Sequence, residues 1–89
     1  PPKMREAKGE YMQQKLSEME GVAEVRGIGM MIGIVLEKGT AKDVAAACIK
    51  HGLLVLTAKT LVRLLPPLTI TFEEIDKGLA ILEKVIKQA

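Results

Sequence analysis

The sequence has very few aromatic residues, with one tyrosine, one phenylalanine and no tryptophan among its 89 residues. Aromatic rings are the surfaces on which many proteins stack bases and sugars, so this kind of recognition has little support. The core must instead be built from Leu, Ile, Val, Met and Ala, because hydrophobic residues still make up 48% of the chain. This composition is typical of a globular protein, and the length is enough for one compact domain.

Cysteine and histidine occur once each. The single cysteine, Cys48, excludes a disulfide within the chain and suits a reducing cytosol. It lies in an apolar helical pattern at 44–49, which favours a small core residue over a reactive thiol. His51 is expected at the end of the same helix, where a positive charge meets the helix dipole favourably. One cysteine and one histidine make at most half of a metal site, so we expect no metal to be bound.

Long hydrophobic runs and clusters of one charge are absent as well. No apolar run approaches the roughly 20 residues of a membrane span, and the first residues lack the apolar core of a signal peptide. The 13 basic and 11 acidic residues are interspersed, so the net charge of +2 forms no basic patch of the kind that binds nucleic acid. We therefore expect a cytoplasmic protein with no membrane and no nucleic-acid partner. Because the chain begins with proline, we also interpret it as a piece of a longer protein.

Apolar periodicity predicts a helix and then a strand in the first part of the chain. Residues 2–20 have the spacing of one apolar helical stripe, and Gly21 is placed to end it. Residues 25–36 are too short and too rich in glycine for a membrane helix, so they predict one buried strand. Glycines on one side of a strand suggest that another backbone comes close there, which is a first sign of an interface. Alternation along this strand predicts one face with Ile28, Met30, Ile32, Ile34 and Leu36, and another with Gly29, Met31, Gly33 and Val35.

A helix and a hairpin are predicted next. Thr40 is a helix cap, and the helix that it begins is expected to run to His51. Residues 53–57 and 61–65 predict two strands, and a connection of about three residues between them favours an antiparallel hairpin. If the strand at 61–65 is central in the sheet, its neighbours are the first strand and its own hairpin partner.

The last helix has the clearest start in the sequence. Thr71 and Glu74 have the spacing of a capping box, and apolar residues at 70 and 75 stand where a hydrophobic staple would place them. The element order is then helix, strand, helix, strand, strand, helix. This order predicts an α+β fold in which a three-stranded sheet is covered by helices.

Glycines at positions 27, 29 and 33 suggest a dinucleotide-binding loop at first sight. However, the third glycine comes one residue late, and the run lies inside an expected strand instead of opening a helix. Close packing explains these glycines better than phosphate binding. The adjacent carboxylates Glu73 and Glu74 are likewise explained by the cap and the dipole of the last helix.

Arg63 is the residue that most needs an explanation. It stands alone among large apolar residues in the segment 61–68, and no acidic residue is its neighbour in sequence. A guanidinium group stays protonated and is costly to bury without a partner. Arg63 must therefore reach solvent past the sheet edge, pair with a carboxylate of this chain, or face a ligand or another domain.

A family resemblance is carried by three segments: VRGIGMMIG at 25–33, GLLVLTA at 52–58 and VRLLPPLTIT at 62–71. They are similar to the strands of the small domain in class III pyridoxal-phosphate aminotransferases, of the acetylornithine type more than of the ornithine or 4-aminobutyrate type. The segment 73–76 matches the usual start of the last helix in that family. The resemblance spans nearly the whole chain, although the linker 58–61 is shorter than in many members.

This resemblance implies that residues 1–89 are the C-terminal small domain of a fold-type I aminotransferase, whose large cofactor-binding domain lies outside this chain. Such homodimeric enzymes transfer an amino group from N-acetylornithine to 2-oxoglutarate in arginine biosynthesis, using pyridoxal phosphate. Arg63 matches the family arginine that binds the α-carboxylate of glutamate or 2-oxoglutarate, or pairs with a large-domain glutamate when that substrate is absent.

The resemblance also implies limits for the segment. The cofactor-binding and catalytic residues of the family belong to the large domain, so none is assigned here, no bound cofactor is expected, and the segment alone should be inactive. The alternative is an autonomous α+β module that binds a small ligand or dimerises without catalysis.

Overall fold

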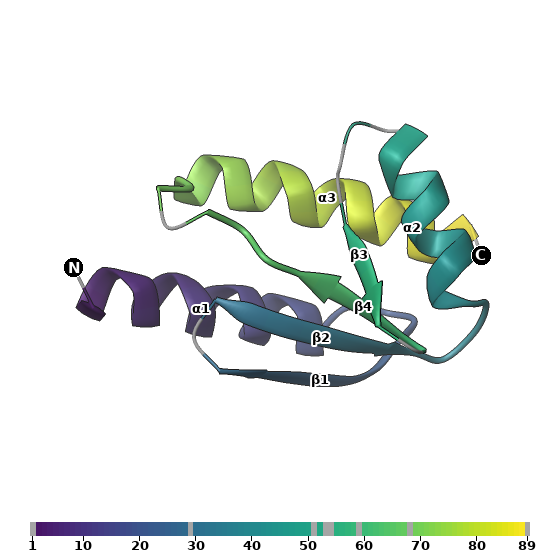
Figure 1. Cartoon of the computed structure of the whole chain (residues 1–89), viewed down its shortest axis with the longest axis horizontal. Helices are drawn as coiled ribbons and strands as arrows, with labels where there is room; N and C mark the ends of the chain where they lie inside the picture. Colours follow the sequence, from purple (N-terminus) through teal and green to yellow (C-terminus); the bar gives the residue numbers. More distant parts are fainter. Residues whose placement is uncertain are drawn as a thin grey trace.

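Three helices and four strands make up the part of the chain that the structure describes (Figure 1). The computed structural model describes residues 2–28, 30–50, 52, 55–58, 60–67 and 69–88. The elements are α1 (Pro2–Ser17), β1 (Val22–Ile28), β2 (Met31–Leu36), α2 (Ala41–Lys50), β3 (Leu56–Ala58), β4 (Leu61–Leu64) and α3 (Phe72–Gln88). The α+β class is thus confirmed, but the sheet has four strands where the sequence predicted three.

The prediction of one strand over 25–36 was wrong, because this segment forms the hairpin β1–β2. Ile28 pairs with Met31, and only Gly29 and Met30 separate them in the sequence. A glycine followed by any residue is a known signal for a two-residue hairpin loop, and this signal was overlooked. Because of the turn, the residues that face the core are odd-numbered in β1 and even-numbered in β2. Val25 is therefore paired with Ile34, and both contribute to the core.

The strand order is β1-β2-β4-β3, and every neighbouring pair is antiparallel. β4 therefore lies between β2 and its hairpin partner β3, which are the neighbours expected from the sequence if the last strand is central. Since β2 and β3 are both antiparallel to β4, they are parallel to each other and α2 connects them. β3 begins at Leu56, and residues 53 and 54 of the predicted strand lie outside the described residues.

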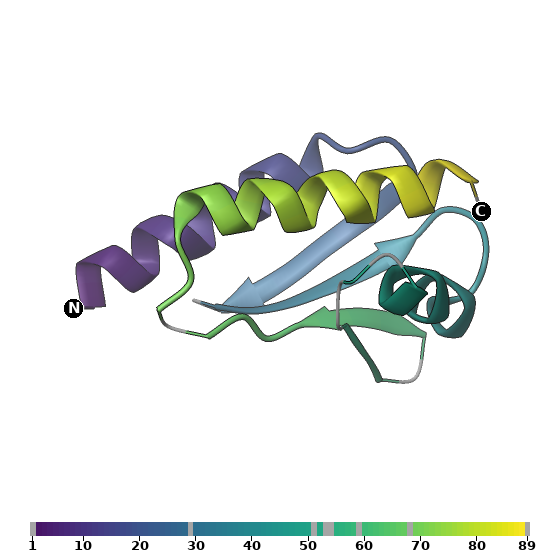
Figure 2. The same ribbon diagram turned by 90° about the horizontal axis from the view of Figure 1, so that it is seen from above.

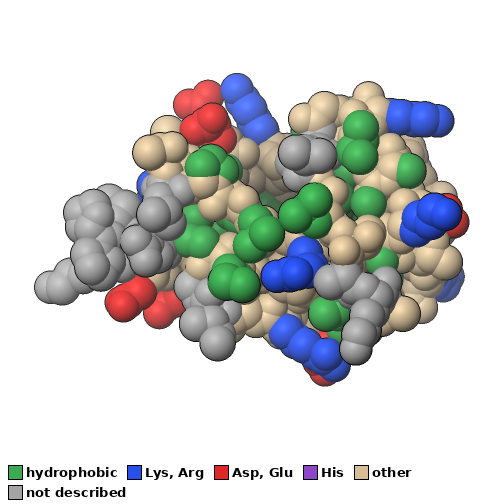
Figure 3. All heavy atoms as spheres, in the orientation of Figure 1, with side chains coloured by type: hydrophobic (Ala, Val, Ile, Leu, Met, Phe, Trp, Pro, Cys, Tyr) green, Lys and Arg blue, Asp and Glu red, His purple; other side chains and the backbone are tan. Residues whose placement is uncertain are grey.

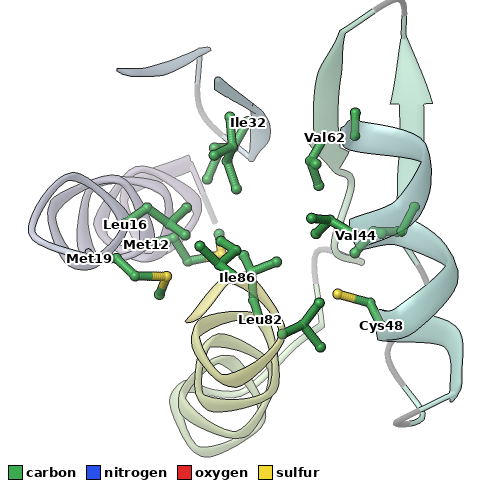
Figure 4. Close-up of a cluster of buried hydrophobic side chains, with 14 of the residues drawn as sticks. Met12, Leu16, Met19, Ile32, Val44, Cys48, Val62, Leu82 and Ile86 are labelled. Carbon is green, nitrogen blue, oxygen red and sulfur yellow. The ribbon is translucent and has the colours of Figure 1, made fainter. Parts of the chain in front are cut away.

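The helices pack on one face of the sheet and enclose the core. From the sheet, Ile32, Ile34 and Val62 are almost completely buried. Figure 4 shows side chains from α1, α2 and α3 pointing toward the same centre, with α3 between the other two helices. Seen from above, α1 and α3 lie together on one side of β1 and β2 (Figure 2), and α2 contacts β3 and β4, where Val62 faces the same core as Ile34. The helices therefore cover one face only.

Local capping explains where the helices begin. Thr40 Oγ1 accepts a hydrogen bond of 3.1 Å from the backbone N–H of Asp43 at the start of α2. The backbone N–H of Thr71 donates to Glu74 Oε1 at 3.0 Å, and that of Glu74 donates to Thr71 Oγ1 at 3.1 Å. Both predicted caps are confirmed. Cys48 is fully buried, as a core residue should be, whereas His51 lies outside the described residues.

Candidate functional site on the open face of the sheet

Arg63 lies on the face of the sheet that the helices leave open. Its neighbour Val62 is fully buried against the helices, and side chains alternate between the two faces of a strand. Arg63 therefore points away from the core and is partly exposed. The position combines an obligatory positive charge with an uncovered surface.

The register of the sheet aligns Arg63 with three other residues across all four strands. Arg26 of β1 is opposite Gly33 of β2, Gly33 is opposite Arg63 of β4, and Arg63 is opposite Leu56 of β3. Residues directly opposite in an antiparallel ladder share a face. This row therefore places two arginines on the open face with a glycine between them.

A shallow hollow of about 430 Å³ lies over this part of the sheet. Gly33 contributes no side chain to its floor. Figure 3 shows the molecule from the side on which the strands lie in front of α1, and hydrophobic side chains gather there beside Lys or Arg side chains. Met31 and Leu56 are about half exposed on this face. The lining residues are Arg26, Gly27, Met31, Ile32, Gly33, Leu61 and Arg63.

The two arginines differ in their partners. Arg26 Nε donates to Glu24 Oε2, two residues along the same strand, and both side chains are more than half exposed. Among the residues that the structure describes, no carboxylate lies within ion-pair distance of Arg63. Of the three explanations that the sequence left open for Arg63, pairing within the described part of the chain has no support. Two explanations for Arg63 remain: its guanidinium faces a ligand or another domain, or it is simply solvated.

Sequence reasoning identified Arg63 but missed Arg26 as its neighbour. The single-strand prediction for 25–36 gave no second strand, so no residue before position 28 could be placed opposite Gly33. The overlooked signal was a sequence pattern, glycine followed by another residue between two apolar runs, because a hairpin at that point brings Arg26 and Gly33 into register.

The other candidate residues have structural roles. The glycines at 27 and 33 lie on paired strands and not at the start of a helix, so phosphate binding by this run has no structural basis. Hydrogen bonds from the backbone and the side chain of Thr71 lower the pKa of Glu74. Burial raises the pKa of the Cys48 thiol, which makes the thiolate less accessible. In the described ranges, no group of three metal-ligating side chains occurs, and no helix is long and apolar enough to cross a membrane.

Pyridoxal phosphate needs a lysine amine beside a phosphate-binding loop. Within the described part of the chain, Lys8 of α1 is the one buried lysine. Its positive charge makes only a minor contribution to the lowered pKa of the Glu74 carboxylate. The assignment of the cofactor site to a large domain outside this chain stays a prediction.

Comparison with known proteins places the chain in a family. The family model for class-III aminotransferases matches residues 3–86, so the chain belongs to the class-III aminotransferase family. It is similar to the acetylornithine aminotransferase of Haemophilus ducreyi, with 37% identity over 82 residues that cover 91% of this chain and 21% of that protein. Similarity to the acetylornithine aminotransferase of Streptococcus mutans is 45% over 83 residues, covering 88% and 22%. The chain therefore spans about a fifth of the length of these relatives.

Solved structures contain the same fold. A lysine aminotransferase from M. tuberculosis, in the internal aldimine form, superposes with a TM-score of 0.85 at 26% identity, over 96% of this chain and 21% of that one. An adenosylmethionine-8-amino-7-oxononanoate aminotransferase from Methanocaldococcus jannaschii gives a TM-score of 0.79 at 30% identity, over 93% and 22%. The four-stranded antiparallel sheet with three helices thus matches part of larger aminotransferase chains.

Proposed function

We propose that this chain is the C-terminal small domain, residues 1–89, of an acetylornithine aminotransferase, and that its open sheet face forms one wall of the active site. The proposed reaction transfers an amino group from N-acetylornithine to 2-oxoglutarate in arginine biosynthesis. The remainder of the polypeptide, as a large domain in a homodimer, would supply the site for pyridoxal phosphate and the catalytic lysine. Support comes from the family membership, the names of the similar proteins, and the fifth of their length that the chain spans.

The observation that carries the proposal is the position of Arg63. It stands on the open face, at the edge of a hollow, without a carboxylate partner among the described residues. A guanidinium binds a carboxylate through two parallel hydrogen bonds, which fix both the position and the orientation of the bound acid. In the proposed enzyme, Arg63 binds the α-carboxylate of glutamate or 2-oxoglutarate, or a large-domain glutamate when that substrate is absent.

The test is Arg63→Ala in the full-length enzyme, with each half-reaction followed separately by the absorbance of the cofactor. Hydrogen bonds to charged groups are worth roughly 1.5–3 kcal/mol each, and 1.36 kcal/mol is tenfold in rate. We therefore expect kcat/KM for 2-oxoglutarate to fall by about 10²-fold or more, with a smaller loss for N-acetylornithine. Arg63→Lys should rescue only part of the rate, because lysine offers a point charge instead of a fork.

Lys84→Ala is the matched control, since it removes one positive charge from an exposed position on α3. Equal losses in both half-reactions would show that Arg63 does not select the keto acid. A large drop in melting temperature with nearly normal kinetics would instead assign Arg63 a purely structural role.

A second candidate function is favoured by the half-exposed Met31 and Leu56 on the open face. Exposed apolar patches of a few hundred Å² often mark interaction sites, so an autonomous ligand-binding or dimerisation module would use the same face. The reading frame that encodes the chain separates the two. A large domain with a cofactor lysine upstream in the same frame supports the enzyme, and a free-standing frame of this length favours the module; self-association of the 89-residue chain through the open face is expected in either case.

A further inference from the structure

β1 is an edge strand of the sheet. Within the described residues its one strand neighbour is β2, and Figure 1 shows β1 along the lower margin of the molecule. Alternate residues of an edge strand present their backbone N–H and C=O groups outward, which makes the edge a template for a further strand. Ala23, Glu24, Arg26 and Gly27 of β1 are exposed. The outer side of β1 is therefore a surface on which another strand can pair.

The charges on β1 make this strand complementary to itself. Glu24 and Arg26 stand on either side of Val25, and both charged side chains are more than half exposed. In an antiparallel pair of two identical strands centred on Val25, position 24 of each strand is opposite position 26 of the other. Opposite charges in directly opposite positions stabilise such a pair, whereas like charges destabilise it. A centre on Glu24 or on Arg26 would bring two like charges together, so the charges select the centre at Val25.

We infer that β1 pairs antiparallel with β1 of a second copy of this chain, around a two-fold axis that passes between the two Val25 residues. Glu24 is then opposite Arg26 of the partner subunit, and Arg26 is opposite Glu24 of the partner subunit. The next pair joins Ala23 with Gly27 of the partner subunit, which are small and leave room for close approach. Because the axis is perpendicular to the joined sheet, the helices of both copies lie on the same side, and the symmetry closes the assembly as a dimer.

Charged residues and bulges also occur on edge strands that avoid pairing. A charge protects an edge when the approaching strand carries the same charge opposite to it, which does not hold for the register centred on Val25. The register shift of β1 lies between Val22 and Glu24, so the three central pairs, formed by residues 24–26, lie on its regular side. The ion pair between Glu24 and Arg26 within one strand is exposed and therefore weak. Its exchange for two pairs between the copies costs little.

The experiment is sedimentation equilibrium of the 89-residue chain at low ionic strength, where exposed charge pairs are least screened. Met31→Lys is the common background, because it is expected to remove association through the open face. We expect this background to form a dimer. Glu24→Arg and Arg26→Glu should each raise the Kd of the dimer by about tenfold or more, because two contacts between opposite charges become two contacts between like charges. Circular dichroism checks that each variant is folded.

A 1:1 mixture of the two variants is the sharpest test. Glu24→Arg leaves positive charges at positions 24 and 26, and Arg26→Glu leaves negative charges at both. A mixed dimer therefore has opposite charges in both cross-strand pairs, and we expect it to form where each variant alone is mainly monomeric. Lys84→Glu is the matched control, since it makes the same charge change at an exposed position on α3 and should keep the dimer of the background.

Three results would overturn the inference: a monomer in the Met31→Lys background, a mixture of the two variants that stays monomeric, or a dimer that Glu24→Arg leaves intact. A dimer that both single variants weaken and the mixture restores would support it. The pairing uses the edge of the sheet and does not involve Arg63. Its failure therefore leaves the proposed function untouched, and the half-reactions of the Arg63 variants test that function separately.

Discussion

Gly21 follows α1 and combines two constraints that a side chain would violate. Its φ is +93°, in the left-handed region, and a Cβ built on it would lie 2.4 Å from Cγ2 of Ile86. Ile86 is buried in the last turn of α3, and a β-branched residue in a helix has essentially one χ1 rotamer. The methyl group of an alanine at position 21 therefore has no easy way to be accommodated.

The cost of Gly21→Ala can be separated by comparison with Gly52→Ala. Gly52 has a φ of +86°, but no atom lies within 4 Å of its Cβ position. The left-handed conformation should lower the free energy of unfolding by roughly 1–2 kcal/mol in both variants. Overpacking should lower it by about 1–3 kcal/mol more, and only in Gly21→Ala. We therefore expect a loss of roughly 2–5 kcal/mol at position 21 against roughly 1–2 at position 52.

The assay is urea unfolding followed by far-ultraviolet circular dichroism, together with the melting temperature. In a domain of this size, 1 kcal/mol corresponds to roughly 4–8 °C. Ile86→Leu removes the methyl group that the new Cβ would contact, so Gly21→Ala should cost less in that background than in the wild type. Equal losses for Gly21→Ala and Gly52→Ala, or no coupling to Ile86, would refute the packing argument.

Three further predictions concern α2 and α3. Thr71→Ala should destabilise the chain by about 1 kcal/mol through loss of the cap, whereas Thr69→Ala, exposed and outside the cap, should change little in the same urea assay. The pKa of Glu74 is lowered in the folded chain, so this residue stabilises the fold fully above the pKa of an unfolded glutamate, about 4.3, and the stabilisation is lost as the pH falls through the folded pKa. The stability difference between wild type and Glu74→Gln should therefore shrink with acidification. A constant difference from pH 7 to 3 would contradict this. Cys48, buried and with a raised pKa, should react with a thiol reagent slowly in native buffer and fully in urea, and complete labelling of the folded chain within seconds would show that the thiol is accessible.

Local hydrogen bonding explains which parts of the fold the sequence by itself determined. The caps at Thr40 and at Thr71 with Glu74 join atoms three residues apart, so the residue types at that spacing were enough to predict where α2 and α3 begin. The buried face of β2 was also predictable, because Ile32 and Ile34 alternate with smaller or exposed residues. Family membership was likewise evident from the short segments of the strands.

The candidate site depended on the tertiary structure. An arginine among apolar residues was visible in the sequence, but its neighbours in space were not. Arg26 and Arg63 lie in one row on the same face only because β1, β2 and β4 are paired. The register of the strands is set by which of their faces the helices bury, and that is a property of the whole core and not of any one segment. The same burial decides that Val62 faces the helices and Arg63 faces outward, because successive side chains of a strand must point to opposite sides of the sheet.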